Sequence, residues 1–217
     1  RMELRYDGEQ FEPVVDLSRS RLELGTRGRG RNINLKGDDE EGELDLELSP
    51  DVPMDLSLKF GAVRATLDLG GMTLTDLTLE TGASEANVDV SRPNQARIRT
   101  AEFRVGAADF TARNLANLNA ARLDVEAGVG EVTLDLGGEL QRDMEVEVSM
   151  GLGALEIRVP SEVGIRLEKD SFLTNLDAED LIKEGRDYYS DNWDAAERRV
   201  TIQVQAAFGN IRVVRTR

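Results

Sequence analysis

The sequence contains no cysteine and no histidine. A chain without cysteine forms no disulfide bonds, and one without histidine cannot build Ser-His-Asp or Cys-His nucleophilic sites. The usual zinc sites also need these two residue types. We therefore predict that the protein is not an enzyme, and we expect no catalytic residue, no cofactor and no metal site.

Aromatic residues are also scarce, at 5% of 217 residues. A core with so few aromatic rings must be built from Leu, Val, Ile and Ala, which suits thin layers. No apolar run approaches the roughly 18–20 residues of a transmembrane helix, and no signal peptide is visible. Because the chain opens with Arg1-Met2, we expect a fragment of a longer protein. Membrane association is expected only through a missing anchor or upstream segment.

Basic residues are fewer than acidic residues, 27 against 42, and the formal net charge is −15. Nucleic acid is excluded as a partner because phosphate contacts need a basic face. Adsorption to an anionic membrane surface is disfavoured for the same reason. The acidic surface is interpreted as one that keeps the protein soluble.

The strongest pattern in the sequence is an alternation of apolar and polar residues with a period of two. Clear examples are residues 44–48, 73–79 and 144–148. Strands with one buried face show this pattern. Nearly all of residues 43–167 can be divided into such strands, separated by glycines.

The strands belong to an internal repeat in which a small residue separates two alternating segments. It recurs at steps of 21, 24, 22, 23 and finally 56 residues. The six aligned positions are Gly61, Gly82, Gly106, Gly128, Gly151 and Ala207. Aliphatic or aromatic residues recur three and five positions before each of them, and four and six positions after.

These spacings predict two short strands per repeat, joined at the glycine and pointing four side chains inward. Glycine is expected at the bend because it reaches positive φ without steric cost, and a second glycine (Gly130, Gly153, Gly209) sharpens the bend. Stacked repeats would bury a continuous column. The predicted fold is all-β, a single-stranded β-solenoid of about 21–24 residues per repeat; the alternative is an antiparallel β-sandwich.

Two segments fall outside the repeat. Residues 1–42 are predicted to be an N-terminal β segment or capping module, and residues 43–217 the β-solenoid domain. Residues 168–196 are interpreted as an insertion with the only helix candidate, Leu176–Lys183, stopped by Gly185.

The candidate partner surface is a group of aromatic residues in or near this insertion: Phe172, Tyr188, Tyr189 and Trp193. Exposed Tyr and Trp are favoured at protein interfaces, and the alternative is that the four rings plug the C-terminal end of the stack. Two other clusters of charged residues are weaker candidates for ligand sites. The acidic run Asp38–Glu47 lacks a calcium-loop spacing, and the turn Thr26–Arg31 lacks the residues of a phosphate-binding loop. Paired carboxylates of a glycosidase are a third hypothesis.

The segments LDVEAGVGEVTLDLGG and VEVSMGLGALEIRVP, with the closing RDYYSDNWDAAERRVTIQVQAAFGNIRV, resemble the toast-rack domains. They are also similar to the C-terminal domain of LiaF-type cell-wall-active antibiotic response proteins and to adhesin-like bacterial β-solenoids. The resemblance covers about residues 43–217, and residues 1–42 look like the extra N-terminal module of some toast-rack proteins.

The resemblance implies a non-catalytic bacterial cell-envelope protein, periplasmic or on the cell surface, that binds or scaffolds a protein or a cell-wall component. The alternative is a sensory or regulatory extracytoplasmic module of an envelope-stress system that responds to cell-wall antibiotics. The sequence does not indicate an oligomeric state.

Overall fold

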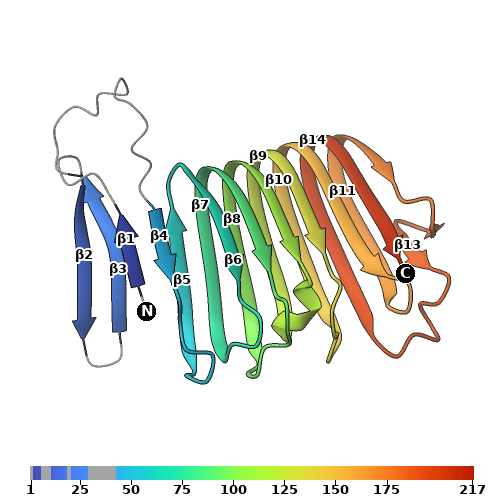
Figure 1. The fold of residues 1–217 in the computed structure, drawn as a ribbon. Coiled ribbons are helices and arrows are strands. Elements are labelled where there is room, and N and C mark those ends of the chain that lie inside the picture. The colour runs from blue at the N-terminus through green and yellow to red at the C-terminus, as the bar shows by residue number, and fades with distance from the viewer. Residues whose placement is uncertain (1, 6–10, 19–20, 29–42) are drawn as a thin grey trace. The chain divides into compact units, whose positions relative to one another are not determined.

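The structure is a computed structural model that describes residues 2–5, 11–18, 21–28 and 43–217 (Figure 1). The chain divides into two compact units, Arg1–Ser49 and Pro50–Arg217, here called unit 1 and unit 2. Within the described ranges, no helix has the length and apolarity needed to span a membrane.

Unit 1 carries two antiparallel strand pairs. Strand β1 (Met2–Arg5) pairs with β4 (Glu43–Leu46), and β2 (Phe11–Ser18) pairs with β3 (Arg21–Gly28). The sequence pattern predicts that residues 43–46 belong to the repeat domain. In the structure these residues form β4, which pairs with β1 of unit 1.

Unit 2 is built around a ten-stranded sheet whose long strands all run parallel to their neighbours (Figure 1). Its strands are β5 (Met54–Phe60), β6 (Val63–Asp68), β7 (Leu74–Asp89), β8 (Ile98–Arg113), β9 (Ala120–Asp135), β10 (Met144–Pro160), β11 (Gly164–Asp177), β12 (Leu181–Glu184), β13 (Asp187–Ser190) and β14 (Arg199–Thr216). A single 3-10 turn, η1 (Leu115–Leu118), follows β8. Because the long strands pair in parallel, the antiparallel β-sandwich alternative is wrong.

The pairing register matches the alignment predicted from the glycines. Phe103 pairs with Val125, Val125 with Val148, and Val148 with Val204. All but three of the 24 predicted inward positions are buried. The exceptions, Leu56, Leu58 and Leu67, lie in β5 and β6, which pair only with β7 among the described residues. The inward column therefore exists, and it is less covered at β5 and β6.

Each long strand turns back on itself near its middle, as Figure 1 shows. Phe103 and Phe110 lie in the same strand, β8, and seven residues of straight strand would separate them by roughly 23 Å. Their ring centroids are 5.6 Å apart, in an edge-to-face contact. The two halves of each strand therefore form two layers with the apolar column between them. We call each bent strand, and the β5–β6 pair, a rung, and the side of unit 2 that carries the bends the bend edge.

The segment 168–196 is not an insertion with a helix, and this expectation is wrong. Its first part completes β11, a further rung in which Leu167 pairs with Ile202 and Leu176 with Ile211 of β14. Its second part is a β-hairpin, β12–β13, which turns at Gly185 with φ +65°. A two-residue loop that starts with glycine fits tight hairpin geometry, and here it overrides the weak helix signal of residues 176–183.

The last strand does not follow the chain order of the stack. Strand β14 lies between β10 and β11 and pairs in parallel with both. The rung β11 escaped sequence detection because Phe172 occupies the glycine position and Lys169 the position of an inward aliphatic residue. The Lys169 ammonium donates a hydrogen bond to the carbonyl oxygen of Thr174 at 3.2 Å, across the bend.

Buried asparagines hold the connections between rungs on the opposite side from the bends. Asn94 is 2% exposed, and its carboxamide accepts a hydrogen bond from the Leu74 N–H and donates to the carbonyl oxygens of Leu74 and Ala96. Asn117 donates similarly to the Val90 carbonyl oxygen. These amides satisfy backbone groups where strand pairing stops, which buried polar groups require.

Candidate functional site

The bend edge has a floor almost without side chains, because rungs approach each other most closely there. A Cβ atom added to Gly82, Gly106, Gly128 or Gly151 would lie 3.0, 2.9, 2.8 or 2.5 Å from the carbonyl oxygen of the aligned glycine in the preceding rung. None of these four has positive φ. The expected reason for this row of glycines is therefore wrong, and close packing of backbones replaces it.

The second row of glycines does meet the conformational prediction. Gly130, Gly153 and Gly209 have φ of 138°, 145° and 134°. Residues with a side chain rarely adopt such angles. The first row thus needs glycine for space alone, whereas the second row needs it for backbone conformation and, at Gly153 and Gly209, for space as well.

A trough of about 960 Å³ runs along this edge over six rungs. We call it the edge trough. Gly106, Gly128, Gly151 and Ala207 line its floor, and its polar wall is formed by Glu80, Arg104, Glu126, Ser149, Gln205 and Asp170. Adjacent strands lie about 4.8 Å apart, so six rungs give a length of roughly 24 Å. The trough is long, shallow and open, a shape that suits an extended ligand better than a compact one.

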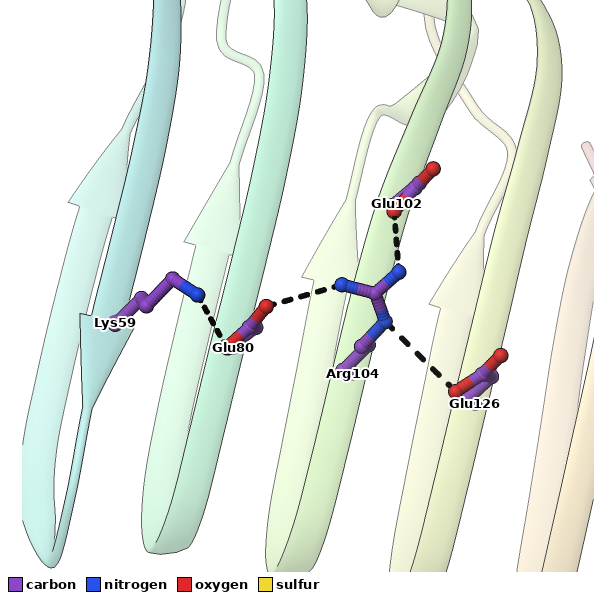
Figure 2. A network of polar contacts seen from close by, with 5 residues as sticks. All are labelled: Lys59, Glu80, Glu102, Arg104 and Glu126. Atoms are coloured by element: carbon purple, nitrogen blue, oxygen red, sulfur yellow. Dashed lines mark hydrogen bonds and ion pairs between the residues drawn. The ribbon is translucent and has the colours of Figure 1, made fainter.

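One wall of the edge trough begins with a charge ladder that alternates in sign from rung to rung (Figure 2). The Lys59 ammonium lies 2.9 Å from the Glu80 carboxylate, which also lies 3.0 Å from the Arg104 guanidinium. Arg104 reaches Glu102 at 2.7 Å and Glu126 at 3.8 Å. Three carboxylates therefore share one guanidinium on this part of the wall.

These contacts shift the titration of both central groups. Hydrogen bonding from Lys59, joined by that from Arg104, holds the pKa of Glu80 below its ordinary value of 4.5. The Glu80 hydrogen bond and the charge of Glu102 raise the pKa of Arg104. Glu80 is consequently ionised at neutral pH and accepts hydrogen bonds.

A second arginine repeats the arrangement on the same outer face. Arg122 lies 2.6 Å from Asp124 and 3.6 Å from Glu145, and it also pairs with Glu147. The hydrogen bond that the Arg122 guanidinium donates to the Asp124 carboxylate is the main cause of its raised pKa. The carboxylates outnumber the guanidinium groups, so this face stays net negative and can attract cationic groups. In the described part of the chain, no three carboxylates are grouped so as to hold a metal ion.

Glu80→Gln tests the charge ladder through acid unfolding. A depressed carboxyl pKa contributes stability that is present above the unfolded-state value of 4.5 and is lost as pH falls through the lower folded-state value. We expect the variant to melt below wild type at pH 7, with the difference in Tm shrinking below pH 4.5. Thermal melts from pH 7 to about pH 3 measure this, with Glu131→Gln, an exposed carboxylate on the same edge, as the control. A constant difference across that range would contradict the prediction.

The other lip of the bend edge carries exposed apolar side chains in four successive rungs. Each follows the floor position by one residue: Val129, Leu152, Phe208 and Leu173, exposed by 52%, 50%, 48% and 58%. Leu152 pairs with both Val129 and Phe208, and Phe208 pairs with Leu173, so the four are neighbours. We call this row the apolar ridge. Sequence reasoning missed it, although the repeat alignment places three of the four, Val129, Leu152 and Phe208, at one position.

Three residues of the predicted aromatic cluster, Tyr188, Tyr189 and Trp193, have described side chains. The rings of Tyr189 and Trp193 lie 5.6 Å apart, edge to face, and both residues are half-buried. Lys183 lies over the Tyr188 ring at 5.5 Å, and Arg199 over the Trp193 ring at 5.4 Å. Phe172 belongs to the bend of β11, four residues beyond the last pairing of β11 with β13, and its side chain lies outside the described structure.

Trp193→Ala separates the two interpretations of this cluster. The Arg199 side chain bonds the carbonyl oxygen of residue 193, which alanine retains, so we expect the circular dichroism to stay β-rich and the Tm to fall by only a few degrees. Binding of an envelope partner through these rings should weaken, and Trp193→Phe, which keeps a ring, should restore part of it. Unfolding of the alanine variant would instead identify the aromatic residues as a structural cap.

The two remaining sequence clusters lie largely outside the described residues. Of the acidic run Asp38–Glu47, the structure describes β4 and Glu47, and of the turn Thr26–Arg31 it describes only the end of β3.

Comparisons with known proteins agree on the type of fold. A family model described as the N-terminal domain of toast_rack matches residues 2–112 and, a second time, residues 101–158. The match begins at residue 2, so it includes the segment that the sequence analysis placed outside the main resemblance. The crystal structure of a "putative cell adhesion protein" from Clostridium sporogenes is similar over 99% of this chain and 82% of that chain, with a TM-score of 0.50 and 17% sequence identity. No curated protein matches.

Proposed function

Because the chain belongs to the toast_rack family, we propose that it is a non-catalytic binding or scaffolding module of the bacterial cell envelope, located outside the cytoplasm. The observation that carries this proposal is the edge trough. Its floor lacks side chains over several rungs, and its walls offer carboxylates, hydroxyl and amide groups. An extended polymer, either a polypeptide or a cell-wall component, can lie across the rungs without displacing any core residue.

The proposed architecture of unit 2 is a β-solenoid with one coil per rung. Parallel pairing in constant register, with steps of 21–24 residues up to β10, supports it. A solenoid repeats the same surface position at each coil, and extended binding surfaces of repeat proteins arise in this way. The adhesion role printed for the Clostridium sporogenes protein is consistent with such a surface.

A binding role fits the chemistry of the edge better than catalysis does. Three charged groups of the wall, Glu80, Arg104 and Glu126, are tied into ion pairs, and the lowered pKa of Glu80 favours a permanently ionised carboxylate over a proton donor. The sequence also offers no histidine or cysteine for nucleophilic chemistry.

Capture from bacterial envelope extracts tests this function. The immobilised chain is compared with Gln205→Arg, which places a bulky cation in the edge trough, and with Gln203→Arg, which makes the same change two residues earlier on the same exposed face of β14. We expect wild type and Gln203→Arg to retain the same protein or cell-wall fragment and Gln205→Arg to lose it. Equal retention by all three would show that the edge trough is not the site. Recovery of a sensor kinase would assign the regulatory role instead.

A further inference from the structure

We propose that the apolar ridge docks a basic amphipathic segment of a partner protein, with its apolar side chains on the ridge and its Lys or Arg side chains on the carboxylates beside it. This inference rests on the binding role proposed above and names the chemistry of the partner.

The first support is the concentration of exposed apolar residues. Nine large hydrophobic residues are exposed among those described, and four of them form the apolar ridge. Singly exposed hydrophobic residues are ordinary, but a contiguous row marks an interaction site. The row also follows one repeat position through four adjacent rungs, so it is a regular feature of the stack.

The ridge is confined to one half of the bend edge. In the first three rungs, the same position holds Ala62, Ala83 and Ala107. Those rungs instead carry most of the charge ladder, in which the two cations Lys59 and Arg104 are balanced by Glu80 and Glu102. In one half of the bend edge, the charged side chains are therefore paired with one another. In the other half, apolar side chains are exposed to solvent.

Charge beside the ridge selects the partner. The bend segments of the four ridge rungs, residues 126–131, 149–154, 205–210 and 170–175, contain Glu126, Glu131 and Asp170 but no Lys or Arg. Glu126 lies 3.8 Å from Arg104 of the charge ladder, so Glu131 and Asp170 supply most of the negative charge that a partner meets. All three carboxylates are on exposed residues, and Glu126 and Asp170 also line the edge trough. An apolar row flanked by anionic groups is complementary to a segment that combines apolar and cationic side chains.

A second copy of the chain fits this surface poorly. It would bring the same carboxylates into contact, and each copy already carries a net charge of −15. Four half-exposed side chains also offer much less than the ~800 Å² per partner of a standard protein interface. A peptide segment needs only a few anchoring side chains in a row, which is what the ridge provides.

The test uses the full chain and a fluorescent synthetic peptide in which leucine and lysine alternate. Fluorescence anisotropy should show saturable binding that weakens with added salt, and the double variant Leu152→Ser/Phe208→Ser should bind at least about tenfold more weakly. The matched control is Ile182→Ser, which removes another exposed apolar residue, 57% exposed, from β12. Circular dichroism confirms that each variant stays folded. A peptide of alternating leucine and glutamate should not bind.

Four results would overturn the inference, and the last of them leaves the proposed function standing. The double variant could bind the leucine–lysine peptide as tightly as wild type, or the leucine–glutamate peptide could bind equally well. Light scattering could also show a wild-type dimer that the double variant converts to monomer, without peptide binding, which would assign the ridge to a second copy. If the envelope component is lost by Gln205→Arg but retained by the ridge variant, the inference fails while the proposed function stands.

Discussion

Val148→Asp is expected to lower the free energy of unfolding of unit 2 by about 4 kcal/mol or more. Val148 is 0% exposed and is paired with Val125 on one side and Val204 on the other. The two side chains paired with this position, Val125 and Val204, offer an aspartate neither a basic group nor a hydrogen-bond donor, and the nearest inward cation, Lys169, is two rungs away. The carboxylate must either be buried unpaired or take up a proton, and both cost free energy.

Urea unfolding followed by fluorescence measures this change, because the single tryptophan, Trp193, lies in unit 2. The matched control is Leu152→Asp, in the same strand but 50% exposed, for which we expect little loss. A Val148→Asp chain with the wild-type urea midpoint would show that the position does not face the core.

Gly153→Ala should cost at least about 3 kcal/mol, although it adds one methyl group. The new Cβ would lie 1.8 Å from the carbonyl oxygen of Gly130, and the residue has φ +145°. The carbonyl belongs to the neighbouring backbone, so relief requires the two rungs to move apart. The ladder between β9 and β10 continues on both sides of this point, which prevents such a movement without loss of hydrogen bonds.

Gly61→Ala is the control, since nothing lies within 4 Å of its added Cβ and its φ is not positive. We expect it to be neutral or to stabilise by about 0.4–1 kcal/mol through the unfolded state. Thermal unfolding of both variants gives the comparison. Similar Tm values for the two variants would mean that neither the contact with Gly130 nor the positive φ of Gly153 makes the substitution costly.

The stacking register could be predicted from the sequence because each inward position recurs as an apolar residue in every aligned repeat. Phe103, Val125, Val148 and Val204 were aligned from spacing alone, and the structure pairs them in that order. Where the repeated signal weakens, prediction failed. In β11, Lys169 replaces the aliphatic residue and Phe172 the glycine, so the rung was interpreted as an insertion. The place of β14 between β10 and β11 leaves no trace in local spacing.

The candidate site was less predictable, because it depends on the outward positions. Those positions follow no apolar period, and the ridge residue Leu173 became visible only when its pairing with Phe208 was known. The aromatic group was found from composition, and the structure shows the contact between Tyr189 and Trp193, whereas the Phe172 side chain lies outside the described structure. The edge trough was marked in the sequence by its glycines, although for a different physical reason.

The place of β14 has a consequence for the order of assembly. Val125 and Val148, in neighbouring rungs, are 23 residues apart, whereas Val148 and its partner Val204 are 56 residues apart. During synthesis from the N-terminus, the earlier rungs can stack one by one, but β10 and β11 must both wait for the final strand. The facing edges of β10 and β11 stay unpaired until residues 199–216 are synthesised and pair with both strands. A chain interrupted before residue 199 would therefore expose two unpaired strand edges, one on β10 and one on β11. Such edges can pair with strands of other chains.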